Sequence, residues 1–156
     1  MTRPVSQFKR IVEQLVLEVQ SITTANGYVT NFKPNSVEVL PYKWKTLANY
    51  PFCFVTFTGG TKTKRYNGRG TRKSKIVRLV FFLRDSKVKN TIFQIADLET
   101  DLEYLFYQVN PYLKETATDK KLVTMVRILT DNASKIQGKP QEVYTVDLEV
   151  VYHECW

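Results

Sequence analysis

The chain has 156 residues, of which 43% are hydrophobic and 24% charged, and its formal net charge is +8. A chain of this size and composition can bury its own core, so we expect a single domain over residues 1–156. Two cysteines are too few for a disulfide scaffold, and no apolar run reaches the roughly 18 residues of a membrane span, so we expect neither a disulfide-rich fold nor a membrane partner.

The first predicted element is an amphipathic helix. Between Val5 and Ile22, apolar residues recur at three- and four-residue steps, with charged and amide side chains on the other side. Asn26-Gly27 is predicted to end the helix, because both residues tolerate the left-handed conformation. Short strands are expected at residues 28–32 and 36–40.

A connection bounded by prolines follows at residues 41–51. It contains Tyr42 and Trp44, residue types that dominate binding hot spots and that would serve as partner anchors. Packing of these rings over the sheet edge is the ordinary explanation, and both interpretations stay open.

Two β-prone segments come next, "FCFVTFT" at 52–58 and "KIVRLVFFLR" at 75–84. They predict a hairpin whose tip is a long, glycine-rich loop at residues 59–75. This loop contains no acid, and removing its basic residues leaves the rest of the chain with a net charge of only +1. Its seven basic residues are Lys62, Lys64, Arg65, Arg69, Arg72, Lys73 and Lys75.

A second helix is predicted over residues 90–111, with Thr91 and Gln94 at capping-box spacing. Its apolar stripe consists of Ile92, Ile95, Leu98, Leu102, Leu105, Phe106 and Val109. The other side is acidic, with Asp97, Glu99, Asp101 and Glu103. A solvated helix face is the ordinary explanation of such charges, and a subunit interface is the functional one.

The last predicted elements are strands at 122–130 and 142–154, separated by a polar loop at 131–140. In the final strand, the alternate residues from Tyr144 to Tyr152 form an apolar face. The order of elements predicts an α+β fold, with a mainly antiparallel β-sheet and two α-helices packed on one face.

Residues for catalysis or cofactor binding are not evident in the sequence. His153 and Cys155 form a His-x-Cys pair, but zinc needs more ligands than these two. The "GRG" at 68–70 has neither the third glycine nor the following helix of a dinucleotide site. We therefore expect no enzymatic activity, no catalytic or metal-binding residues and no cofactor.

The basic segment has three interpretations. It is a solvated hairpin tip that favours solubility, an arm that binds an acidic protein surface, or an arm that contacts nucleic-acid phosphates. The sequence around it has no signature of a sequence-specific nucleic-acid-binding domain. Backbone contact by a small basic nucleic-acid-binding protein therefore stays the alternative function.

The chain resembles the tail terminator proteins of long-tailed bacteriophages, also called tail-completion or minor tail protein U-like proteins. The resemblance extends over roughly residues 5–155 and is carried by six stretches: "TTANGYVTNF", "YPFCFVTFTGG", "KIVRLVFFLRDS", "IADLETDLEYLF" and the closing pair "LVTMVRILTDNAS" and "YTVDLEVVYHEC". It is a pattern of elements without an invariant motif, so no functional residue of the family is transferred to a position here.

The resemblance implies a structural virion protein with a mainly antiparallel sheet and two helices on one side. Members of the family assemble in the host cytoplasm as a ring, usually a hexamer, at the head-proximal end of the tail tube. The implied partners are other copies of the chain, the tail tube protein and the head-tail connector protein. The basic segment would reach a neighbouring subunit or the tube, or would line the lumen and touch genomic DNA.

Overall fold

We analysed a computed structural model, which describes residues 6–39, 50–66, 70–84, 90–135 and 141–155. Within these ranges, the side chains of residues 61–66, 135, 141 and 155 are outside the description. The described residues form one sheet of five strands in the order β1-β2-β3-β5-β4. The strands are β1 (Val37–Val39), β2 (Phe52–Tyr66), β3 (Gly70–Arg84), β4 (Met125–Lys135) and β5 (Gln141–Cys155).

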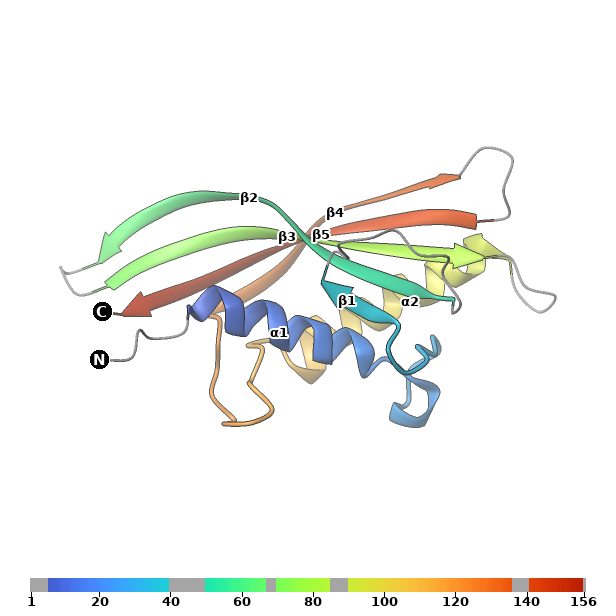
Figure 1. Ribbon diagram of the computed structural model, residues 1–156, viewed down its shortest axis with the longest axis horizontal. Coiled ribbons are helices and arrows are strands. Elements are labelled where there is room, and N and C mark those ends of the chain that lie inside the picture. The colour runs from blue at the N-terminus through green and yellow to red at the C-terminus, as the bar shows by residue number, and fades with distance from the viewer. Residues whose placement is uncertain (1–5, 40–49, 67–69, 85–89, 136–140, 156) are drawn as a thin grey trace.

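The sheet is antiparallel except at one edge. β2, β3, β5 and β4 pair antiparallel in that order, and the short β1 lies parallel to the beginning of β2. The long strands twist together, and the β2–β3 and β4–β5 hairpins extend toward opposite ends of the molecule (Figure 1). The ends of the two hairpins therefore lie far from each other.

Two α-helices, α1 (Gln7–Gln20) and α2 (Thr91–Tyr104), lie on the same side of this sheet (Figure 1). Ser6 is the N-cap residue of α1, and Asn90 rather than Thr91 caps α2, where the Asn90 side chain accepts the backbone N–H of Phe93. A short π-helix, η2 (Leu105–Val109), continues α2. The predicted α+β fold with two helices on one face is thus confirmed.

The core lies between the helices and the sheet. It is formed by alternate residues of each long strand and by the apolar stripe of each helix, because a strand turns every second side chain to the same face. The predicted apolar face of β5 is fully buried there, with Tyr144 2% and Tyr152 1% exposed. The opposite face of the sheet has a smaller apolar cluster of Phe52, Phe54 and Phe82.

The chain between α1 and β1 differs from the predicted strand at 28–32. Thr23 caps the 3₁₀-helix η1 (Thr24–Asn26), and Gly27 follows with a φ of 88°. Tyr28 and Phe32 are buried, but this segment pairs with no strand of the described chain. Tyr28 packs against Tyr104 of α2 and Phe32 against Phe81 of β3, so their apolar character reflects burial and not strand pairing.

The bounds of β4 also differ from those predicted for the strand at 122–130. β4 begins at Met125 and continues through Lys135, so half of the predicted polar loop at 131–140 is strand, and residues 136–140 lie outside the described residues. Polar residues are compatible with this strand because the side chains of residues 131–134 are exposed to solvent.

Candidate interaction surface

The basic segment at 59–75 is mostly paired strand and not the long loop that the sequence predicts. β2 continues to Tyr66 and β3 begins at Gly70, with two register shifts between them. Residues 70–75 of β3 also pair with residues 150–155 of β5 on their other side. Pairing with β5 explains why this segment is strand and not loop. A two-stranded hairpin rich in glycine and threonine is only marginally stable, and a third paired strand stabilises it.

Lys73 and Lys75 lie on the helix side of this ladder and contact the protein's own residues. Lys73 forms an ion pair with Glu154, and the Glu154 carboxylate also accepts the Gln7 backbone N–H at 3.4 Å. The hydrogen bond from Lys73 lowers the pKa of Glu154 from its ordinary value. The acid-free segment is therefore partly neutralised by a carboxylate from the end of the chain.

Lys75 lies between two aromatic rings. Its Nζ is 5.7 Å from the ring centre of Phe8 and 5.4 Å from that of Phe57, which is within the range of cation–π attraction. Gly60 leaves the space for it, since a Cβ at Gly60 would be 2.8 Å from this Nζ. Lys75 thus attaches the start of α1 to the β2–β3 hairpin.

Arg72 differs from these two lysines. It is exposed, and the alternation of β3 places it on the opposite face of the sheet, beside His153 of β5 and Lys64 of β2 in the backbone register. Of the seven basic residues predicted to contact a partner, Arg72 is the one whose described side chain suits that role. Arg69 and the side chains of Lys62, Lys64 and Arg65 lie outside the described residues.

The same outer face carries cross-strand ion pairs further along the sheet. Arg78 donates two hydrogen bonds to the Asp147 carboxylate, at 2.8 and 3.2 Å, which raises the pKa of the guanidinium. Arg127 donates to Glu149 at 3.1 Å. Both acids belong to β5 and are bound by arginines of the neighbouring strands β3 and β4.

The predicted acidic side of α2 divides in the same way. Asp101 is only 4% exposed, and its two carboxylate oxygens accept the backbone N–H groups of Val29 and Thr30, at 3.2 and 2.7 Å. The sequence suggested Asp101 as a residue of a surface interface. Its side chain is instead buried and holds the segment after α1 against α2. Glu99 and Glu103 are exposed and Asp97 is half-buried.

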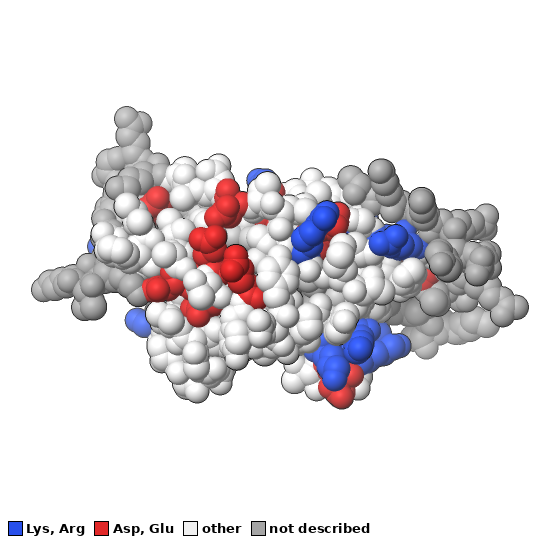
Figure 2. All heavy atoms as spheres, turned by 180° about the vertical axis from the view of Figure 1, so that it is seen from behind, with Lys and Arg blue, Asp and Glu red and all other residues white. Residues whose placement is uncertain are grey.

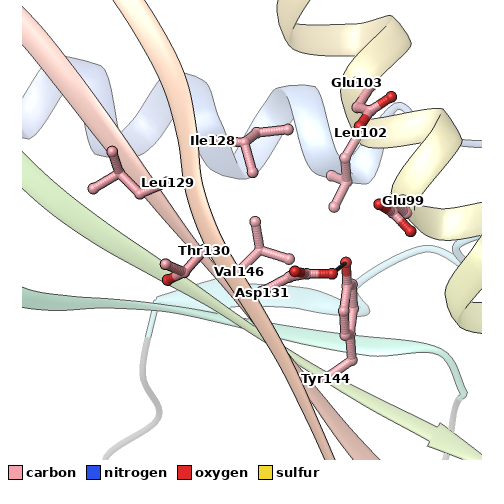
Figure 3. A pocket seen from close by; sticks show the side chains of 9 residues that line it. All are labelled: Glu99, Leu102, Glu103, Ile128, Leu129, Thr130, Asp131, Tyr144 and Val146. Carbon is pink, nitrogen blue, oxygen red and sulfur yellow. Dashed lines mark hydrogen bonds between the residues drawn. The ribbon is translucent and has the colours of Figure 1, made fainter.

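Glu99 and Glu103 border a small hollow between α2 and the β4–β5 hairpin (Figure 3). Its volume is about 70 Å³, below the roughly 300–1,000 Å³ of small-molecule pockets. The Tyr144 hydroxyl points into it and donates to Asp131 at 3.0 Å. Burial, then the bonded Asp131 and the two glutamates, raise the pKa of Tyr144.

Exposed apolar side chains beside this hollow were not predicted. Tyr104, Tyr107 and Val109 are each about half exposed, and the Tyr107 hydroxyl accepts the Ile128 backbone N–H of β4 at 3.0 Å. Val109 was assigned to the buried stripe, as was Ile92, which is 66% exposed. The π-helix η2 explains Val109: Leu105 and Phe106 stay buried, but the wider turn of η2 places Val109 out of phase with the α-helical stripe.

Charge is segregated across the face that α2 occupies. Acidic side chains gather over the half that contains α2, and basic side chains lie toward the half with the β2–β3 tip (Figure 2). In the part of the chain that the structure describes, no group of three His, Cys, Asp or Glu side chains is placed to hold a metal ion. No described helix is long and apolar enough to span a membrane.

Tyr42 and Trp44 lie outside the described residues, so their two interpretations stay open. Cys53 is a buried free thiol whose pKa is raised by burial. Fold and surface together define a small α+β domain whose exposed chemistry is ionic and aromatic.

No protein family profile matches the chain, and no curated protein sequence matches it. Among solved structures, the fold is similar to a chain from the virion of a native gene transfer agent particle, at 7% sequence identity. The similarity covers 96% of this chain and 92% of that chain, with a TM-score of 0.49.

Proposed function

We propose that this chain is a non-enzymatic structural protein of a virion that caps the head-proximal end of a phage tail tube. In this role several copies, with six the expected number, form a ring that stops tube polymerisation and presents a surface to the head-tail connector. The partners are then other copies of the chain, the tube protein and the connector protein.

The proposal is supported by the agreement between the fold and the resemblance noted in the sequence. That resemblance implies a mainly antiparallel sheet with two helices on one side, and this is the architecture of the chain. Each of the two hairpins also extends toward its own end of the molecule, which gives the subunit two distinct ends to offer to two different neighbours.

The observation that carries the ring is the segregation of opposite charges. Exposed Arg72 lies near the β2–β3 tip, whereas exposed Glu99 and Glu103 lie on α2. A head-to-tail contact joins different surfaces of two copies, and opposite charges favour this arrangement over contacts between like surfaces.

A charge-exchange experiment tests the proposal. Arg72→Glu should weaken self-association about fivefold, and Glu99→Arg with Glu103→Arg should do the same, because attraction between exposed charges on adjacent ends of two copies contributes up to about 1 kcal/mol. An equimolar mixture of the two variants should recover part of the lost association. Sedimentation velocity gives the assembly size, and negative-stain images of the protein with tail tubes show whether tube ends are capped.

Arg84→Glu is the matched control, since Arg84 is also exposed on β3 but at the opposite end of the strand. Association unaffected by Arg72→Glu, or affected equally by the control, contradicts the charge-based ring. Salt-sensitive retention of single subunits on DNA, lost in Arg72→Glu, would support the nucleic-acid-binding alternative instead.

A further inference from the structure

The sheet has two long edges that no strand of the described chain covers. β4 is one edge over its eleven residues. At the other edge, β1 pairs with β2 only from Cys53 to Val55, so residues 56–66 of β2 pair with β3 alone. The uncovered part of β2 is thus also eleven residues long, because β2 ends at Tyr66.

These two edges run in opposite directions. β2, β3, β5 and β4 are antiparallel from each neighbour to the next, so β4 is antiparallel to β2. If copies of the chain are placed side by side in the same orientation, the β4 edge of one copy meets the β2 edge of the next copy as an antiparallel neighbour. The alternation of the sheet then continues across the junction.

Such pairing would use the backbone groups on the outer side of β4. Every second residue of an edge strand directs its N–H and C=O away from the sheet. The Ile128 N–H bonds to the hydroxyl of Tyr107, a side chain that is itself half exposed, so a pairing strand would take the place of this hydroxyl. A long uncovered edge of this kind is a template for pairing with another strand.

Charge distinguishes the two edges from each other. β4 contains Arg127, which is bound to Glu149, and Lys135, and its one acid is the exposed Asp131. The exposed Glu99 and Glu103 lie beside Asp131 around the hollow. The uncovered part of β2 includes Lys62, Lys64 and Arg65 in its sequence and no acid. Pairing β4 with β2 places the acid-free run of β2 beside these three acids, whereas pairing β2 with β2 brings only basic residues together.

We propose that the outer edge of β4 pairs antiparallel with residues 56–66 of β2 in a second copy of the chain. One sheet then continues from subunit to subunit, with the aromatic side chains of α2 and η2 beside the junction. This inference deepens the proposed ring and rests on it for closure, while the pairing itself applies to any head-to-tail assembly.

The positions of the edges also determine the geometry of the assembly. β4 lies level with residues 74–83 of β3, and the uncovered part of β2 lies level with residues 70–78. Full overlap therefore displaces each copy by four to five residues along the strands, about 15 Å at 3.3 Å per residue. Such a stagger tilts the strands relative to the assembly axis, which closing a sheet on itself requires.

Pairwise cysteine cross-linking tests the pairing in the full chain with Cys155→Ser, in which buried Cys53 remains. Thr58→Cys or Thr61→Cys in one preparation is mixed with Thr130→Cys or Ala133→Cys in another under mild oxidation. Paired strands bring Cα atoms within disulfide range, so matched positions should cross-link about tenfold faster than Thr118→Cys, an exposed control far from both edges in the sequence.

Antiparallel pairing also predicts which pairs of cysteine positions cross-link fastest. As the β2 cysteine moves from 58 to 61, the most reactive β4 position should move in the opposite direction, from 133 toward 130. A shift in the same direction, or equal rates at all positions including the control, overturns the proposal.

The outcomes separate this inference from the proposed function. Rings that cap tail tubes but show no β4–β2 cross-link overturn the pairing and leave the function standing. Cross-linked oligomers that never cap tubes support the pairing and contradict the function. Subunits that stay single at all concentrations and do not cross-link overturn the pairing.

Discussion

Asp101 and Glu99 are two residues apart on α2, yet they have different roles. The sequence groups them in one acidic face, but the side chain of Asp101 turns inward and accepts two backbone hydrogen bonds, whereas Glu99 is exposed. Hydrogen bonds to a carboxylate are stronger than those between neutral groups, and losing them leaves donors without a partner. At the scale of single residues, burial decides which acids stabilise the fold and which serve contact.

Asp101→Ala should lower the free energy of unfolding by about 1–3 kcal/mol, because the Val29 and Thr30 N–H groups lose their acceptor. Glu99→Ala, the control on the same helix, should stay within about 0.5 kcal/mol of the parent. Urea denaturation of the three proteins measures the difference. Equal effects of the two substitutions would mean that the Asp101 bonds do not stabilise the fold.

The ion pair between Arg10 and Glu115 predicts a pH dependence. Hydrogen bonds from Arg10 and then Thr118 lower the pKa of Glu115 to about 2 from an ordinary value of 4.5. A carboxyl with a lowered folded-state pKa stabilises the fold above its unfolded value and loses this contribution as the pH falls. Stability should therefore decline from about pH 4.5 toward pH 2 through this pair.

Glu115→Gln should make the decline between pH 4.5 and pH 2 shallower, and thermal unfolding followed across that range measures it. Glu13→Gln is the control, because Glu13 is an exposed carboxylate on the same helix as Arg10. If both variants follow the pH profile of the parent, the Glu115 pair contributes nothing to acid stability.

At the scale of elements, successive side chains of β3 point to opposite faces of the sheet, so neighbouring basic residues have different contacts. Lys73 and Lys75 face α1 and are used by Glu154 and by two aromatic rings, whereas Arg72 faces the other side and is exposed. The hairpin is thus attached to the domain by two of its lysines, and the charge left for a partner is smaller than the sequence suggests.

Lys75→Ala should lower stability by about 1 kcal/mol, through loss of contact with the Phe8 and Phe57 rings. Arg72→Ala should leave stability within about 0.5 kcal/mol and weaken self-association. Thermal unfolding measures the first effect, a shift of about 2–4 °C, and light scattering the second. The reverse pattern would show that Lys75 faces the partner and Arg72 the domain.

At the scale of the whole molecule, opposite charges and opposite strand edges occupy different parts of the subunit (Figures 1 and 2). Neither feature stabilises the isolated domain, whose core lies between the helices and the sheet. Both match the surfaces that a head-to-tail contact requires, so assembly should respond to solution conditions that leave the fold unchanged.

Self-association should therefore weaken as ionic strength rises from 0.1 M to 1 M, since the screening length falls from about 10 Å to about 3 Å. The thermal unfolding of the subunit should change little over the same range, because its core is apolar. Sedimentation velocity and thermal scans at matched salt concentrations check both statements. Association that strengthens with salt would indicate an apolar interface in place of the charged one.

The sequence by itself determined the kinds of elements and the buried faces of most of them. The alternation from Tyr144 to Tyr152 and the helical spacing in α1 report burial directly, because each backbone geometry sends side chains to one face at a fixed period. The fold class followed from the order of these elements, and the acid-free stretch at 59–75 was visible as a charge run.

Only the tertiary structure decided what the charged residues do and where the sheet ends. Asp101 accepts from residues 29 and 30, Lys73 pairs with Glu154, and residues 70–75 become strand because β5 lies beside them. Each depends on a partner more than 70 residues away in the sequence, and local periodicity contains no record of such a partner. The uncovered edges of β4 and β2 are likewise properties of strand order, which is set when the whole core packs.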